Sequence, residues 1–298
     1  MALPDDEGHR SGAGRARPLA HDGHRSGAGR ARPLAHDWLG FCRRAADAAR
    51  TAVADLSTSA ARSVATGRGE GGDTTLAVDR AAEDAVFREL EALGRPLTAV
   101  SEERGELELG ARHTGTADVR VVIDPVDGSM NAKRGLPFAC VSIAVASGPR
   151  MADVEVGFVA ELDPARDWWA VRGGGAWLDG ERLRPLSPGS LEVLGLETAR
   201  PDLVAAAAGA IAGVRARRIR ALGSVAISLC LVASGRMDAM VTLHEVRSVD
   251  MAAAQLLVRE AGGARRRAAG AAEAELRRFV SEVGPRVAEP ARRAPGAA

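Results

Sequence analysis

Several residue types that often carry function are scarce in this chain of 298 residues. It has no tyrosine, Lys133 is its only lysine, and aromatic residues make up 3% of it. We interpret this bias, together with abundant alanine, glycine and arginine, as GC-rich coding rather than function. The formal net charge is +1, so no bulk field attracts nucleic acid or an acidic membrane. Trp168, Trp169 and Trp177 fall in expected strands, where packing is favoured over the stacking of nucleobases.

Cysteine is also rare, and so are long apolar runs. Cys42, Cys140 and Cys230 stand alone, with no pair at metal-binding or redox spacing. Cys140 and Cys230 lie in apolar segments, which predicts buried free thiols and a reducing compartment. No apolar run reaches membrane-spanning length, and the first residues lack the apolar core of a secretory signal. The expected location is the cytoplasm, with no membrane partner.

The first part of the chain repeats itself. Residues 8–22, with the sequence GHRSGAGRARPLAHD, occur again unchanged at 23–37. The copies have no apolar period, so we predict that residues 1–37 form a disordered basic tandem repeat. A recent duplication or a start site set too far upstream is the favoured explanation. Alternatively, the arginines of this arm could contact nucleic acid, or its histidines could bind a metal.

Helical and strand patterns alternate after Trp38. We predict one domain over 38–284, with subregions 38–185 and 186–284, and a frayed tail at 285–298. The expected helices lie near 38–64, 75–93, 201–212, 225–233 and 250–262. The expected strands lie near 98–101, 119–123, 138–146, 154–160, 168–171, 176–178, 219–222 and 237–241. The segment 104–117 is expected to be a polar loop.

One stretch concentrates groups that can do chemistry. The β-branched run Val119–Ile123 predicts a buried strand, and the carboxylates of Asp124 and Asp127 follow it across a turn. Close carboxylates repel each other, so they need a shared proton or a cation, and their hard oxygens suit Mg²⁺. Gly128 and Ser129 then open a helical turn, whose free N–H groups can bind a phosphate. An ordinary turn with a serine cap is the alternative reading of this stretch alone.

Other carboxylates stand near the ends of expected elements. Asp79 falls in the first turn of a helix, and Asp250 begins another. Glu102 and Glu103 follow the strand expected at 98–101. Taken singly, each of these residues is an ordinary helix-start or solvent-exposed carboxylate.

Taken together, these segments resemble the inositol monophosphatase family, the Mg²⁺-dependent, lithium-sensitive phosphatase superfamily that includes the archaeal-type fructose-1,6-bisphosphatases. The segments are Asp79, Ser101-Glu102-Glu103, Asp124-Pro125-Val126-Asp127-Gly128-Ser129-Met130-Asn131, Gly223-Ser224 through Gly235-Arg236-Met237-Asp238-Ala239, and Asp250-Met251-Ala252-Ala253 through Glu260-Ala261-Gly262-Gly263. Their order and spacing are highly specific, and the resemblance covers roughly residues 40–265. It implies an α+β fold, the layered αβαβα sandwich of this family.

The resemblance also implies a role for individual residues. The expected ligands of two or three Mg²⁺ ions are Glu103, Asp124, Asp127, Asp250 and the main-chain carbonyl of Val126. The expected catalytic residues are Glu103, Ser129, which activates the attacking water, and Asp79, which orients the Ser129 hydroxyl. The expected phosphate and substrate contacts are Asp127, Gly128, Ser129, Gly223, Ser224 and Asp250. A metal-activated water would attack phosphorus in line, and the family favours a homodimer.

The sequence leaves the substrate open. An inositol monophosphate is favoured among small phosphorylated polyols and sugars, and fructose-1,6-bisphosphate, a 3′-nucleotide bisphosphate or histidinol phosphate are alternatives. Three positions depart from the family pattern. Val249 replaces a frequent tryptophan, Arg68 replaces a lysine, and Leu243 or Glu245 falls where a glutamate contacts the sugar. A non-catalytic, phosphate-binding regulatory protein is the alternative of another class.

Overall fold

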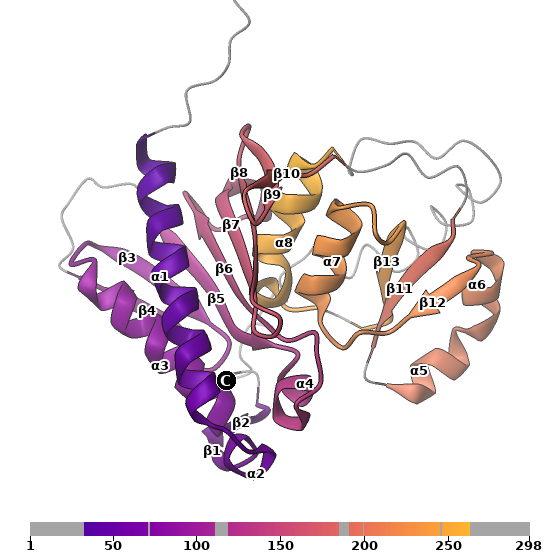
Figure 1. Ribbon diagram of the computed structural model, residues 1–298, viewed down its shortest axis with the longest axis horizontal. Helices are drawn as coiled ribbons and strands as arrows, with labels where there is room; N and C mark the ends of the chain where they lie inside the picture. The colour runs from indigo at the N-terminus through magenta and orange to yellow at the C-terminus, as the bar shows by residue number, and fades with distance from the viewer. Residues whose placement is uncertain are drawn as a thin grey trace, which may run out of the picture. The chain divides into compact units, whose positions relative to one another are not determined.

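The folded part of the chain is built in layers. The computed structural model describes residues 33–70, 72–110, 119–184, 191–198, 200–244 and 246–262. Helices α1 (Pro33–Asp55) and α3 (Ala77–Ala92) cover one face of an eight-stranded sheet (Figure 1). Helices α7 (Val225–Ala233) and α8 (Ser248–Glu260) lie between that sheet and a three-stranded one. The short helices α5 (Pro201–Ala206) and α6 (Ala208–Gly213) form the last layer, which confirms the αβαβα arrangement.

The large sheet runs in the order β10-β9-β8-β7-β6-β5-β3-β4. Its strands are β3 (Leu97–Ser101), β4 (Gly105–Leu109), β5 (Arg120–Asp127), β6 (Cys140–Ala146), β7 (Val154–Glu161), β8 (Arg166–Val171), β9 (Gly175–Leu178) and β10 (Glu181–Arg182). Strands β3 and β5 are parallel, and every other neighbouring pair in this sheet is antiparallel. The residues that follow β3 and β5 therefore emerge at the same edge.

The second sheet consists of three parallel strands in the order β12-β11-β13. They are β11 (Val193–Glu197), β12 (Arg218–Arg220) and β13 (Ala239–Thr242). A hairpin of β1 (Ala65–Arg68) and β2 (Thr74–Leu76) precedes α3. The remaining short elements are α2 (Ser59–Arg62), α4 (Ser129–Arg134) and the 3₁₀ turn η1 (Met151–Asp153).

Several boundaries differ from those expected. The first helix begins at Pro33 and ends at Asp55, not near 64. Strands β1, β4 and β11 were not expected, because β1 and β4 are exposed strands with polar residues and Gly195 interrupts the apolar run of β11. Residues 1–32 and the tail at 285–298 lie outside the described residues. No helix in the described ranges is long and apolar enough to cross a membrane.

Apolar side chains from the helices fill the spaces beside the large sheet. Phe41 of α1 and Leu90 of α3 are buried with Ile123 of β5 in one core. Ile227 of α7 and Leu257 of α8 are buried with other apolar residues in a second core on the opposite face. Because each helix places its apolar stripe against a sheet, the helices hold the strand ends in fixed positions.

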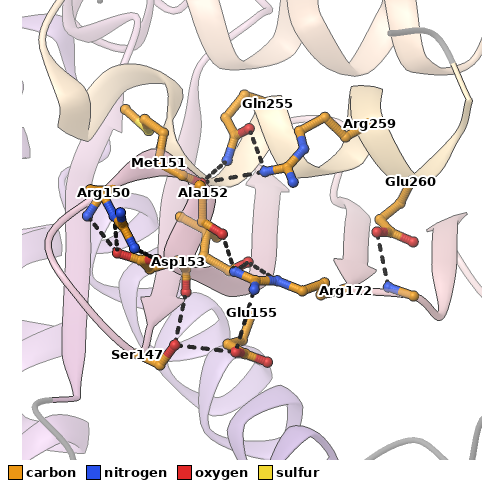
Figure 2. A network of polar contacts seen from close by, with 12 residues as sticks. Ser147, Arg150, Met151, Ala152, Asp153, Glu155, Arg172, Gln255, Arg259 and Glu260 are labelled. Atoms are coloured by element: carbon orange, nitrogen blue, oxygen red, sulfur yellow. Dashed lines mark hydrogen bonds and ion pairs between the residues drawn. The ribbon is translucent and has the colours of Figure 1, made fainter. Parts of the chain in front are cut away.

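The far end of α8 is fixed by polar contacts to the large sheet (Figure 2). Gln255 and Arg259 donate hydrogen bonds to the main-chain carbonyl of Met151. Glu260 accepts hydrogen bonds from the main-chain N–H groups of Gly173 and Gly175 in the turn between β8 and β9. These contacts hold the far end of the helix in place.

Candidate active site

The parallel pairing of β3 and β5 brings two carboxylates together. Ser101 is the register partner of Ile123, and the N–H of Glu102 donates to the Ile123 carbonyl at 3.2 Å. Neighbours in register on parallel strands point to the same face of a sheet. Continuing the register by one residue therefore places Glu102 beside Asp124.

A third carboxylate comes from the first turn of α8. Ligand oxygens of Glu102, Asp124 and Asp250 all lie within 4.8 Å of one another. Asp124 is 1% exposed, and the other two are partly buried. We call Glu102, Asp124 and Asp250 the carboxylate cluster.

Glu103, which was expected to bind metal, lies outside the carboxylate cluster. Its carboxylate instead accepts a hydrogen bond from the Thr75 hydroxyl on the β1–β2 hairpin. Both glutamates lie in the turn between β3 and β4, where Glu102 faces Asp124 and Glu103 faces the hairpin. Glu102 therefore takes the place expected for Glu103 in the carboxylate cluster, and the assignment of either glutamate as a metal ligand stays a prediction.

Asp127 is directed at the start of α7. Its Oδ2 accepts hydrogen bonds from the Ser224 hydroxyl at 2.7 Å and from the Ala226 N–H at 2.6 Å. It does not belong to the carboxylate cluster, although its charge and that of Asp250 raise the pKa of Asp124. Ser224, expected to contact substrate, thus fixes Asp127 here.

The turn after β5 holds a hydroxyl beside a buried carboxyl group. Ser129 donates a hydrogen bond to the main-chain carbonyl of Val126 at 2.8 Å. Asp79 Oδ2 accepts from the Leu76 N–H at 3.0 Å, and its Oδ1 is buried with no hydrogen-bond partner in the described ranges. Burial raises the pKa of Asp79 to about 6, while the Ser129 hydroxyl lowers it. Asp79 and Ser129 thus lie close together, and the expected hydrogen bond between them stays a prediction.

Gly128 gives this turn its shape. Its φ of 91° lies in the left-handed region, and an added Cβ would lie 2.6 Å from the Phe138 carbonyl. Asn131 then donates to the carbonyls of Phe138 at 3.0 Å and Leu222 at 2.7 Å. These bonds join the turn to the loop before α7.

Gly223 in that loop is held by a buried carboxylate. Glu197 at the end of β11 accepts hydrogen bonds from the N–H groups of Leu222 at 3.0 Å and Gly223 at 2.8 Å, and from the Ser228 hydroxyl at 2.6 Å. The Gly223 N–H is thus already used. A substrate contact by Gly223 remains a prediction. In the structure, its N–H group holds the loop before α7 against the end of β11 through Glu197.

The electrostatics of the site favour binding of a cation. Burial raises the pKa of Asp124 well above its usual range, and the charges of Glu102, Asp127 and Asp250 raise it further. Burial raises the pKa of Asp127 to about 7, against the hydrogen bonds from Ser224 and the Ala226 N–H. Burial likewise raises the pKa of Glu102 and of Asp250, and the charge of Arg247 lowers both.

The donor set fits a divalent cation. Three carboxylates within 4.8 Å provide the hard oxygen ligands that Mg²⁺ prefers. Asp250 Oδ1 is buried and has no hydrogen-bond partner in the described part of the chain, so it has capacity for a further ligand. Repulsion inside the carboxylate cluster would be relieved by such an ion.

Comparison with known proteins identifies the family. A model of the inositol monophosphatase family matches residues 39–296. The chain belongs to the inositol monophosphatase family. This family comprises phosphatases, and the resemblance seen in the sequence is confirmed.

Curated relatives within this family carry different names. A protein of Methanothermobacter thermautotrophicus, named fructose-1,6-bisphosphatase/inositol-1-monophosphatase, is 35% identical over 240 residues, covering 76% of this chain and 82% of that protein. Nus factor SuhB of Escherichia coli K12 is 38% identical over 200 residues, covering 64% of this chain and 70% of that protein.

Solved structures agree with the family assignment. The native crystal structure of the extragenic suppressor protein suhB from Bartonella henselae aligns with a TM-score of 0.66 at 27% identity, covering 76% of this chain and 85% of that one. The IMPase of Thermotoga maritima aligns with a TM-score of 0.63 at 27% identity, covering 76% and 84%. The layered fold is therefore that of inositol monophosphatases.

Among the described residues, no position that departs from the family pattern belongs to the carboxylate cluster. Val249 is buried in α8, and Arg68 is exposed on β1. Leu243 packs against the small core of the three-stranded sheet. Glu245 lies outside the described residues. None of these departures removes a member of the carboxylate cluster.

One charged residue of the site was not expected from the sequence. The Arg247 guanidinium pairs with both Glu102 and Asp250. The signal that could have found it is its position three residues before Asp250, which places it just ahead of the first turn of α8.

Proposed function

We propose that this protein is a Mg²⁺-dependent phosphatase of a small phosphorylated polyol or sugar, with inositol monophosphate as the first candidate. The single observation that carries the proposal is the carboxylate cluster, which lies where β3 and β5 meet the first turn of α8. Membership of a phosphatase family supports the reaction class. Phosphate monoesters hydrolyse very slowly without a catalyst, so a strongly polarising site is needed.

Glu102, Asp124 and Asp250 would hold the metal. The Val126 carbonyl and the Oδ1 of Asp127 are further candidate ligands at the end of β5. When bound, Mg²⁺ lowers the pKa of water and balances the charge that develops on the phosphoryl and leaving oxygens. A family dependence on metal supports this assignment, while the identity and number of ions belong to the proposal.

The chain's own residues would position the water and the phosphate. Asp79 would accept a hydrogen bond from the Ser129 hydroxyl, which would then orient the attacking water. The N–H groups of Gly128 and Ser129, at the start of α4, would donate to phosphate oxygens. Asp127, held by Ser224 and α7, would keep this turn in place. Each of these residues acts by orientation and needs no covalent intermediate.

The substrate is tested by measuring phosphate release from the full chain with and without Mg²⁺. The panel contains inositol-1-phosphate, fructose-1,6-bisphosphate, adenosine-3′,5′-bisphosphate and histidinol phosphate. Release from inositol-1-phosphate that requires Mg²⁺ is the expected result. A faster release from fructose-1,6-bisphosphate would favour the second substrate, which the name of the Methanothermobacter relative supports.

A second candidate function is non-catalytic regulation. It is favoured by the relatives that carry the name Nus factor SuhB. Bound Mg²⁺ without phosphate release from any member of the panel would support it and overturn the phosphatase proposal.

The proposal also includes a homodimer and a cytoplasmic location. Light scattering of the purified chain tests whether it is a homodimer. Nucleic-acid contact by residues 1–37 is tested by deleting them.

A further inference from the structure

One arginine lies against the carboxylate cluster. Nη2 of Arg247 lies 2.5 Å from Glu102 Oε1 and 3.4 Å from Asp250 Oδ1. The arginine side chain is 43% exposed, whereas those of the two carboxylates are 16% and 15% exposed. The partly exposed guanidinium of Arg247 therefore lies on the solvent side of two mostly buried carboxylates.

Capping of α8 does not need this guanidinium. The main-chain N–H of Arg247 donates to Asp250 Oδ2 at 3.2 Å, and that bond can hold the first turn with any residue except proline at 247. Within the described ranges, the hydrogen bonds and ion pairs of the Arg247 side chain go only to Glu102 and Asp250. Arg50 differs, because its guanidinium also binds the carbonyls of Glu161 and Arg166. Arg247 is thus held by the carboxylates alone.

The same carboxylates are the candidate metal ligands. A cation placed among Glu102, Asp124 and Asp250 would compete with Arg247 for Glu102, and it would lie close to the guanidinium that stands 3.4 Å from Asp250 Oδ1. Positive charges on the ion and on the guanidinium would also repel each other at this range. Binding of the ion should therefore release the guanidinium from Glu102.

A released Arg247 would stand at the rim of the site, where an anionic ester arrives. The guanidinium is planar and presents paired N–H donors that match two phosphate oxygens. Its partial exposure leaves it room to turn from the carboxylates to such a ligand.

We propose that Arg247 exchanges partners: it neutralises Glu102 and Asp250 while the site is free of metal, and after metal binds it pairs with the phosphate oxygens of the substrate. This inference rests on the proposed function, because the anion it assigns is the phosphate ester. It makes Arg247 both a competitor of the metal and a substrate-binding residue.

The test compares Arg247→Gln with the unchanged full chain. Mn²⁺ binding is measured by electron paramagnetic resonance at pH 8, and inorganic phosphate binding is measured by calorimetry at saturating Mg²⁺. Arg247→Gln should bind Mn²⁺ roughly three- to tenfold more tightly, since no ion pair has to be broken. The same variant should bind phosphate about tenfold more weakly. The opposite signs distinguish this role from a structural one.

Two further variants complete the design. Arg259→Gln removes the same charge from the other end of α8, where the side chain contacts the Met151 carbonyl and Gln255, and it should change neither affinity. Arg247→Lys keeps the charge but loses the fork, so it should leave Mn²⁺ affinity near that of the unchanged chain while phosphate affinity falls.

Each outcome decides the inference. Unchanged or weaker Mn²⁺ binding by Arg247→Gln would overturn the competition, and unchanged phosphate binding would overturn the substrate contact. If the unchanged chain bound Mn²⁺ yet released no phosphate from any ester, the phosphatase proposal would fail while the exchange of partners still stood on its own measurements. If the unchanged chain bound no Mn²⁺, both would fail.

Discussion

At the scale of residues, the direction in which a carboxylate points at the end of a strand decides whether it can join the carboxylate cluster. Asp124 and Asp250 could be predicted from the sequence, because their motifs are specific. The choice between Glu102 and Glu103 could not, since it depends on the register of β3 against β5, which the sequence does not state. Arg247 was missed for a related reason: a pattern of acidic residues does not say which cation lies among them.

The paired variants Glu102→Gln and Glu103→Gln test this assignment. Glu102→Gln removes a charge from the carboxylate cluster, so its Mn²⁺ affinity should fall by about tenfold or more. Glu103→Gln loses charge beside Thr75, and its Mn²⁺ affinity should stay within about twofold of the unchanged chain. Calorimetric titration of both variants at pH 8 measures the difference. A larger loss in Glu103→Gln would restore the original assignment.

At the scale of elements, close packing of α8 on the large sheet positions Asp250. Helices α7 and α8 were predictable, because they have clear apolar patterns and start signals. The polar edge strand β4 was not predictable, since its pairing with β3 and not its composition makes it a strand. Sequence patterns thus revealed α7 and α8, which bury apolar side chains, and missed β4, which is held by its pairing with β3.

Gly157 of β7 lies directly against the backbone of α8. A Cβ at this position would overlap the main-chain carbonyl of Ala253 in α8. Gly157→Ala should therefore lower the free energy of unfolding by about 1–3 kcal/mol, as measured by urea denaturation. Turnover should fall too, since α8 carries Asp250.

Gly209 of α6 provides the matched control for the same chemical change. It is exposed, and apart from its chain neighbours and its own helix backbone no atom of the described residues lies within 4 Å of an added Cβ. Gly209→Ala should raise the free energy of unfolding by roughly 0.5–1 kcal/mol, because alanine favours the helix. Equal effects of the two substitutions would contradict the close contact between α8 and β7.

At the scale of the whole molecule, the layers gather several carboxyl groups in a mostly buried place. The resemblance implied the αβαβα arrangement, which is confirmed. The order of the strands and the partner of each charged side chain could be learned only from the structure. Concentrating like charges in this way costs stability when no metal is present. The stability of the metal-free protein should therefore depend on pH.

The sign of this dependence follows from the pKa shifts. Burial raises the pKa of Asp79 from 3.8 to about 6 and that of Asp127 from 3.8 to about 7. Between the unfolded and folded values the folded state binds more protons, so stability is lost as pH rises through that window. The metal-free chain should melt on the order of 5 °C higher at pH 5.5 than at pH 8.

Differential scanning fluorimetry in the presence of a chelator measures this effect. Saturating Mg²⁺ should reverse the trend, because the ion binds the deprotonated carboxylates and stabilises the folded state more at pH 8 than at pH 5.5. A metal-free melting temperature that is lower at pH 5.5 would show that these groups do not carry raised pKa values.

The most direct test of the central claim is the Mg²⁺ dependence of phosphate release by Asp124→Asn. Asparagine keeps the size of the side chain and removes the charge at the centre of the carboxylate cluster. The rate with inositol-1-phosphate should fall by about 10²–10³-fold while the fold is kept. The exposed substitution Asp202→Asn should leave it unchanged. Full, Mg²⁺-dependent turnover by Asp124→Asn would contradict the assignment of this cluster as the metal-binding active site.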